Sequence, residues 1–536
     1  MTLEDEIRKR RTFGIVSHPD AGKTTLTEKL LLFGGAIHQA GAVKSNKIRK
    51  GATSDFMEIE RQRGISVATS VLAFHYKGTK INILDTPGHK DFAEDTYRTL
   101  TAVDSVIVVV DGAKGVELQT KKLVEVCRMR QIPIIVFINK MDRDAKDPFD
   151  LFDELERELK LNPTPLSFPI GDGQDFKGIY NIIKKNTLFF YSEKDKQKLP
   201  SYEAIDDLNS QDLSKFLESD EIEELVQNID VISELYPNFE IDPYLESSIH
   251  PVMFGSALKN LGVKELLETL VEIAPSPRPK LTDRRTINPS EKKFAGFVFK
   301  IHANMDPKHR DRLAFLKIVS GQFVRNTSYF HVRLGKNLKF SSPNAFFAEK
   351  RKVIDISYPG DIVGLHDTGN FKIGDTLTNG ENLHFSGIPS FSPEHFRFII
   401  NKNPLKAKQL KKGINQLMDE GVAQLFTLQI NGRQIIGTVG VLQFEVIQYR
   451  LLHEYGAECT YESIPVYKAC WVDKNNQHPE FNDFKRLKQK FLATDKQDQL
   501  VFLADSQFSL SHTQQKFPNI EFHFQSDFNT ISESMV

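Results

Sequence analysis

Near its start the chain contains a segment that strongly limits how it can fold. An apolar run at residues 12–16 leads into the turn SHPDAGKT at 17–24, and a helix-like stretch then runs toward Gly34 and Gly35. A strand, a glycine-containing turn and a helix in this order make a phosphate-binding loop, because backbone N–H groups and the helix N-terminus attract anionic oxygens. The segment therefore predicts an α/β fold with this strand in a mostly parallel sheet.

Two side chains of this loop have the chemistry that phosphate binding needs. Lys23 can reach the terminal phosphates of a nucleoside triphosphate, and the hydroxyl of Thr24 can bind Mg²⁺. Ser17 stands where the motif usually has its first glycine. The sequence does not determine what this serine does to the loop geometry.

Three further apolar runs, at 81–84, 106–110 and 134–138, alternate with helix-like stretches. This alternation is typical of βαβ units and supports the mostly parallel sheet. In open α/β sheets, ligands bind beyond the carboxyl ends of the strands. We therefore expect the chemistry of this domain in the loops that follow these runs.

The loop after the run 81–84 reads DTPGH. Asp85 lies at the strand end, where it can hold a metal ion directly or through water. Gly88 can bring its N–H close to a γ phosphate because it has no side chain in the way. His89 follows beside the expected γ phosphate, so we predict that it orients the attacking water.

The loop after the run 134–138 reads NKMD. Its Asp142 can accept hydrogen bonds from the N1 and 2-amino groups of guanine, and adenine lacks both donors. Lys140 can lie along the base, and Ser256 and Ala257, after another short apolar run, can close over the base carbonyl. Three such loops in one order, each after a strand, predict a guanine nucleotide site.

The predicted site therefore draws on four separate loops. Its expected GTP or GDP contacts are Ser17, His18, Pro19, Asp20, Ala21, Gly22, Lys23, Thr24, Asp85, Thr86, Pro87, Gly88, His89, Asn139, Lys140, Met141, Asp142, Ser256 and Ala257. The expected ligands of Mg²⁺ are Thr24, Asp85 and Ser66. Ser66 ends a long polar stretch at 44–66, which we expect to become ordered when the γ phosphate is present.

Beyond this region the pattern of the chain changes twice. A helix signal at 263–273 is followed by three prolines, which cannot continue it. The next segment has β-rich runs with glycine turns, and the last has a strand, helix, strand, strand, helix, strand order. We predict a P-loop GTPase domain at 1–279 with an acidic helical insertion around 180–250, a β-barrel domain at 280–388, and a C-terminal α+β, ferredoxin-like domain at 389–536.

The composition limits the surroundings in which the chain can act. No apolar run approaches the roughly 20 residues that cross a bilayer, and the charged start lacks a signal-peptide segment, so we expect a cytoplasmic protein that does not bind membranes. The net charge of −1 gives no overall attraction for nucleic acid, and we expect no binding to DNA. Any RNA contact has to be local; the basic segment 402–412 fits either such a contact or a solvated helix face.

Several of these segments resemble known proteins. DAGKTT at 20–25, RGIS at 63–66 and DTPGH at 85–89 resemble translational GTPases; SHPD at 17–20, DFAEDTYRTL at 91–100, NMDPKHRDR at 304–312 and GVLQF at 440–444 narrow the resemblance to bacterial class II peptide chain release factors. The first half is also similar to elongation factor G. That factor has additional domains for which we expect no room in this chain.

The resemblance implies a ribosome-dependent GTPase of translation termination that promotes departure of class I release factors after peptide release. It implies the ribosome, through its RNA and proteins, and class I release factors as partners, and we expect a monomer. Most translational GTPases have threonine where Ser66 stands; serine keeps the hydroxyl. Two alternatives stay open: a GTP-gated module that grips a protein client away from the ribosome, and an elongation-type enzyme that moves tRNA and mRNA.

Overall fold

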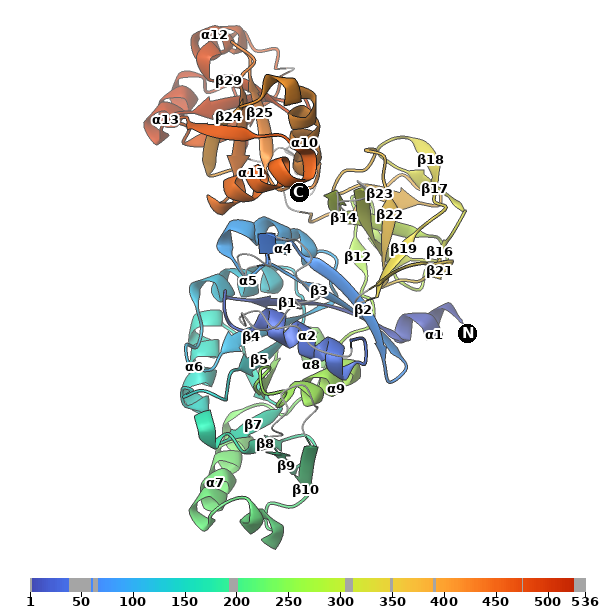
Figure 1. The fold of residues 1–536 in the computed structure, drawn as a ribbon, viewed down its shortest axis with the longest axis vertical. Helices are drawn as coiled ribbons and strands as arrows, with labels where there is room; N and C mark the ends of the chain where they lie inside the picture. The colour runs from blue at the N-terminus through green and yellow to red at the C-terminus, as the bar shows by residue number, and fades with distance from the viewer. Residues whose placement is uncertain are drawn as a thin grey trace.

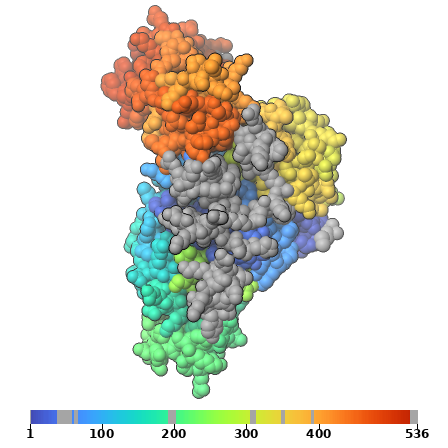
Figure 2. All heavy atoms as spheres, in the orientation of Figure 1, coloured from blue at the N-terminus to red at the C-terminus, as the bar shows by residue number. Residues whose placement is uncertain are grey.

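The computed structural model describes residues 2–37, 59–60, 66–191, 201–303, 312–347, 350–388, 392–474 and 476–524 (Figure 1). In Figure 1 a blue-to-green α/β domain is followed by a yellow β-rich domain and an orange-to-red α+β domain. Figure 2 shows the green insertion of the first domain and the orange-to-red third domain at opposite ends of the molecule. The predicted fold class is confirmed, and the boundaries at 279 and 388 stay predictions.

The first domain is built on one sheet in the order β2-β3-β1-β4-β5-β11-β6. Its strands are β1 (Arg10–Ser17), β2 (Ser70–Tyr76), β3 (Thr79–Asp85), β4 (Ser105–Asp111), β5 (Ile134–Asn139), β6 (Pro163–Pro165) and β11 (His250–Phe254). Only β2 is antiparallel to its neighbour within this set. All four predicted runs are strands, whereas β2 was not predicted.

Helices cover both faces of this sheet, which explains why inner strands such as β4 and β5 are almost continuously apolar. Among the described residues outside the insertion, the α-helices of the domain are α1 (Leu3–Arg8), α2 (Lys23–Phe33), α4 (Ala93–Thr99), α5 (Leu118–Met129), α6 (Pro148–Leu159) and α9 (Val263–Ile273). Along β4, Val106 and Val108 pack in the cluster that includes residues of α5 and α6. Ile107 and Val109 pack in the cluster on the other face, with residues of α2 and α9.

The insertion around 180–250 is helical only in its second half, so the prediction of a helical insertion needs correction. Its first half belongs to an antiparallel sheet of β7 (Ser167–Ile170), β8 (Gly178–Asn181), β9 (Asn186–Tyr191) and β10 (Ser201–Ile205). The helices α7 (Ser219–Leu235) and α8 (Ile241–Leu245) follow. The short apolar strand β9 pairs with both β8 and β10, and its partners are not indicated by the sequence around it.

The second domain is barrel-like, and its described residues form strands but no helix. These strands are β12 (Lys280–Leu281), β13 (Thr286–Ile287), β14 (Ala295–Ala303), β15 (Arg312–Ser320), β16 (Phe323–Val324), β17 (Ser328–His331), β18 (Lys336–Lys339), β19 (Asn344–Phe347), β20 (Lys350–Val353), β21 (Ile356–Ser357), β22 (Ile362–His366) and β23 (Thr376–Thr378). Stacked aromatic rings such as Phe323 and Tyr329 fill its core. Its sheet continues into the first domain where β19 meets β2.

The third domain has the predicted order. β24 (His395–Asn401), α10 (Ala407–Asp419), β25 (Gln424–Leu428), β26 (Gln434–Thr438), α11 (Leu442–Tyr455) and β27 (Cys459–Ser463) form its first unit. Gly421 and Gly456 follow the two helices with φ of 72° and 64°, as expected of helix C-terminal stops. The elements β28 (Lys468–Val472), α12 (Glu480–Lys488), β29 (Leu492–Asp495), β30 (Leu500–Ala504) and α13 (Gln507–Lys516) extend the same sheet and cover it.

No helix in the described part of the chain is both long and apolar enough to span a lipid bilayer.

Candidate nucleotide site

The phosphate-binding loop connects β1 to α2, as predicted. Gly22 precedes α2 with φ of 97°, and a Cβ there would lie 2.3 Å from Nδ2 of Asn139. Glycine is therefore required at this position for both backbone and space. Ser17 does not have a positive φ, and its hydroxyl donates to the carbonyl of His18 at 2.8 Å. A serine at position 17 thus fits the loop without backbone strain.

Lys23 and Asp85 meet between the first two loops. The Lys23 ammonium donates to Oδ1 of Asp85 at 2.5 Å, and both side chains are buried. Oδ2 of Asp85 is also buried and has no hydrogen-bond partner among the described residues. An unpaired buried carboxylate oxygen is unfavourable, so a cation beside it would be stabilising.

These residues fit a magnesium ion. Oδ2 of Asp85 and the hydroxyl of Thr24, the second residue of α2, would hold it. The described residues include no group of three or more His, Cys, Asp or Glu side chains that could hold a metal.

Asn139 connects the phosphate loop to the loop of Ser256 and Ala257 through two hydrogen bonds. Its Nδ2 donates to the carbonyl of Ala21 at 2.8 Å, and its Oδ1 accepts from the N–H of Ala257 at 2.9 Å. Because both groups of one amide are used, this side chain sets the spacing of two walls of the site. The sequence placed Asn139 in the site but did not reveal this supporting role.

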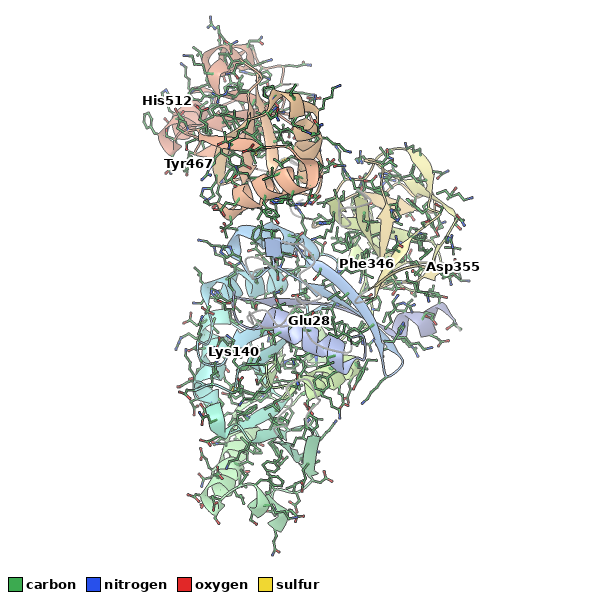
Figure 3. All side chains as sticks on the ribbon, viewed as in Figure 1. Glu28, Lys140, Phe346, Asp355, Tyr467 and His512 are labelled. Atoms are coloured by element: carbon green, nitrogen blue, oxygen red, sulfur yellow. The ribbon has the colours of Figure 1, made fainter. Side chains whose placement is uncertain are left out.

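Lys140 acts on the same loop from the other side. Its ammonium donates to the carbonyl of Asp20 and to Oδ2 of Asp111, each at 2.5 Å. Figure 3 labels Lys140 within the first domain. Asp111, the last residue of β4, was missed by sequence reasoning, although its place at a strand end was a usable signal.

The residues predicted to read the base also lie together. The hydroxyl of Ser256 donates to Oδ1 of Asp142 at 2.5 Å, which fixes the direction of that carboxylate. Met141 is buried beside Gly112, where its sulfur would lie 3.1 Å from an added Cβ. Ser256 was expected over the base carbonyl, and the structure brings its hydroxyl to Asp142.

The loop from Asp85 to His89 packs against the phosphate loop. Thr86 donates its hydroxyl to the carbonyl of Ile15 at 2.8 Å, and a Cβ on Gly88 would lie 3.5 Å from the backbone of Pro19. His89 is half-buried, and its Nδ1 accepts from the N–H of Asp91 at 3.2 Å. The structure thus brings the two predicted phosphate-binding loops into contact.

Two predictions fall partly outside the described residues. The polar stretch 44–66 is described only at 59–60 and at Ser66, which precedes β2. Its ordering by the γ phosphate and the Mg²⁺ ligation by Ser66 stay predictions. The segment 304–312 is described only at Arg312.

The model of the Elongation factor Tu GTP binding domain matches residues 8–276, which is just over half of the chain. The chain belongs to this GTPase family. Elongation factor G domain 2 matches residues 293–380, and Class II release factor RF3, C-terminal domain, matches residues 385–514. The chain is therefore a release-factor-type translational GTPase, an enzyme that binds guanine nucleotide, hydrolyses GTP and interacts with the ribosome.

A solved structure supports the fold of this translational GTPase. A crystal structure of a protein from Thermus thermophilus superposes with a TM-score of 0.70 at 19% sequence identity, over 88% of this chain and 71% of that chain. At this identity the similarity shows a shared fold and no more.

Proposed function

We propose that this GTPase promotes dissociation of class I release factors from the ribosome after peptide release, and that GTP hydrolysis then frees the GTPase itself. The observation that carries the proposal is the RF3-type C-terminal domain at 385–514 in one chain with the GTP-binding domain. The client-binding module and the elongation-type enzyme would share the GTPase domain, but their other domains would bind different partners.

In the proposed reaction the phosphate loop and Lys23 hold the phosphates, and Asp142 reads the guanine. A water oxygen forms a bond to the γ phosphorus while the bond from that phosphorus to the β–γ bridging oxygen breaks, which gives GDP and inorganic phosphate. His89 orients the water. Lys23 has to exchange its contact with Asp85, at 2.5 Å in this structure, for a phosphate oxygen.

Mg²⁺ would neutralise charge on the β and γ phosphate oxygens when bound. We propose Thr24, Asp85 and Ser66 as its protein ligands. The buried, unpaired Oδ2 of Asp85 is the observation that supports this assignment.

Ribosome binding needs surfaces outside the nucleotide site. The basic helix α10 presents exposed lysines, including Lys408, Lys411 and Lys412, and local cations of this kind suit phosphate contacts. We infer that this face contacts ribosomal RNA and that the protein acts as a monomer in the cytoplasm. Light scattering of the purified protein tests the monomer.

The deciding experiment measures multiple-turnover GTP hydrolysis with and without ribosomes, with ATP as the control nucleotide. Stimulation by ribosomes excludes a client-binding module that acts elsewhere. A second assay then follows release of a labelled class I factor from post-termination ribosomes. Acceleration of that release supports the proposal, whereas movement of tRNA and mRNA without it favours an elongation-type enzyme.

A further inference from the structure

The residues just after His89 connect the nucleotide site to the third domain. We propose that Asp91 is a positioning residue for His89, and that the third domain holds Asp91 in place through the N-terminus of α11. This inference rests on the proposed role of His89 in orienting water. It adds that hydrolysis depends on whether α11 is docked.

The link begins at the histidine ring. Asp91 lies in the short 3₁₀ turn η1 (Lys90–Phe92), and its backbone N–H donates to Nδ1 of His89. Oδ1 of Asp91 lies 3.5 Å from the same ring nitrogen. Because Nδ1 accepts a hydrogen bond from the backbone, a neutral ring carries its proton on Nε2. Nε2–H is then the group that can donate to the attacking water or to a phosphate oxygen.

The other oxygen of Asp91 contacts the third domain. Oδ2 accepts from the N–H of Leu442 at 2.8 Å. Leu442 is the first residue of α11, and the first N–H groups of a helix have no partner within it. A buried carboxylate at this position is favoured both by the hydrogen bond and by the helix dipole. One side chain therefore joins the turn after His89 to a helix that begins 351 positions further along the chain.

Gly440 shows how closely the two domains approach. A Cβ at this glycine would lie 2.2 Å from Cγ and 2.5 Å from Cα of Asp91. Gly440 does not have a positive φ, so space and not backbone conformation excludes a side chain here. Gln443 holds the turn, since its Oε1 accepts from the N–H groups of Val439 and Gly440 at 2.9 Å and 3.0 Å.

An apolar cluster also packs at this contact between η1 and α11. Phe92, next to Asp91, packs with Val446 of α11 and with Ile59 and Val67 of the first domain. Leu442 and Tyr449, also on α11, are half-buried against this cluster. The docking of α11 therefore combines apolar burial with the hydrogen bond to Asp91.

A second contact between the first and third domains lies on α4, which follows η1 in the chain. Arg98 of α4 donates to the carbonyl of Gly421 in the third domain at 3.0 Å. On the same helix, the carboxylate of Asp95 lies 3.0 Å from the ammonium of Lys300 in the second domain. Burial alone would raise the pKa of Asp95, but the Lys300 ammonium and the hydrogen bonds from Thr69 outweigh burial, so this pKa is lowered. The segment after His89 is thus held from both neighbouring domains.

If α11 moves away, Asp91 loses the N–H of Leu442 and the apolar cover beside it. The turn η1 can then shift, and with it the N–H that fixes the ring of His89. A misplacement of a reacting group by about 1 Å can cost about 100-fold in rate. Docking of the third domain is therefore expected to raise turnover without changing nucleotide affinity.

The test compares four full-length variants in ribosome-stimulated GTP hydrolysis: Asp91→Ala, Asp91→Asn, His89→Ala and the double variant of His89→Ala with Asp91→Ala. Asp91→Ala should lower kcat about 10- to 100-fold and leave KM and GDP affinity unchanged. Asp91→Asn keeps an oxygen acceptor for the N–H of Leu442, so it should retain most activity. In the His89→Ala background, Asp91→Ala should cause no further loss, because it acts through the histidine.

Gly440→Ala tests the link from the third domain. Its Cβ meets Asp91, so the same loss of kcat with unchanged GDP affinity is expected, and the melting temperature shows whether the chain still folds. The exposed neighbour Lys90 supplies the control, since Lys90→Ala should leave turnover unchanged.

The outcomes separate the two proposals. Full activity of His89→Ala would refute the proposed role of His89 and this inference with it. A large loss in His89→Ala together with normal turnover in Asp91→Ala, or an additional loss in the double variant, would overturn only the inference. A loss in Asp91→Ala that appears in KM instead of kcat would overturn it as well.

Discussion

The two ends of the nucleotide site are supported in different ways. At the base end, Asn139 and Lys140 connect to the phosphate loop, and Ser256 fixes Asp142, all within the first domain. At the phosphate end, the turn after His89 is held by Asp91, whose carboxylate contacts the third domain. We therefore infer that recognition of the nucleotide rests on one domain, whereas positioning for hydrolysis draws on a second one. Such a switch would bind GTP in any domain arrangement but hydrolyse it in one.

The largest effect is expected from a substitution at the base end of the nucleotide site alone. Asp142→Asn replaces a carboxylate that pairs two guanine donors with an amide that suits the 2-carbonyl of xanthine. The preference for GTP over xanthosine triphosphate should fall by about 10⁴-fold, as found where buried pairing groups lose their partners. Competition binding measures the ratio, and ribosome-stimulated hydrolysis of xanthosine triphosphate should be near normal. Retained guanine preference would refute the assigned role of Asp142.

The second largest effect is expected from a substitution at the phosphate end of the site. His89→Ala should lower ribosome-stimulated hydrolysis about 10²- to 10⁴-fold, the range for loss of a group that assists proton transfer. GTP affinity should stay unchanged because the base end is intact. Rapid-quench kinetics with equilibrium binding checks both values. Weakened binding of similar size would show that the two ends are not independent.

A smaller effect tests how rigid the base end is. Asn139→Ala leaves the carbonyl of Ala21 and the N–H of Ala257 unpaired in a buried place, at a cost of about 1–3 kcal/mol for each group. GDP affinity and the melting temperature should fall together, while the contact with the third domain is unaffected. Asn337→Ala, at an exposed asparagine of β18, is the matched control. Loss of kcat without loss of affinity would contradict this assignment.

The smallest effect is expected at the second contact with the third domain, the hydrogen bond from Arg98 to Gly421. Arg98→Ala removes the hydrogen bond to the carbonyl of Gly421 together with the ion pair to the buried Glu94, and coupling between sites through such contacts is worth about 0.5–2 kcal/mol. Stimulated turnover should drop a few-fold with normal GDP affinity. Arg157→Ala, an exposed arginine on α6, serves for comparison. Equal effects of the two arginines on turnover would remove Arg98 from the link.

The sequence was sufficient for the parts of the molecule that depend on local pattern. Apolar runs followed by SHPDAGKT, DTPGH and NKMD predicted three strand ends of one sheet, and each run lies in that sheet. Short-range chemistry carries this information, because a strand, a turn glycine and a helix start are recognised from neighbouring residues. The ferredoxin-like order of the third domain followed from the same kind of signal.

Other features were beyond the sequence because their partners lie far away along the chain. The strand β2 and the hairpin of β9 and β10 depend on pairing with other strands, and short apolar runs do not identify such partners. The support given to Lys140 by Asp111 likewise became visible only when β4 and β5 lay side by side.

What the sequence by itself determined is the order of side chains whose chemistry suits phosphate, guanine and Mg²⁺, since residue type and order decide that; their roles at the site stay predictions. Only the tertiary structure decided how these groups are held, because a hydrogen bond such as that between Asp91 and Leu442 joins residues whose separation along the chain carries no local signal. The packing of the third domain against the turn η1 of the first domain is what brings them within 2.8 Å.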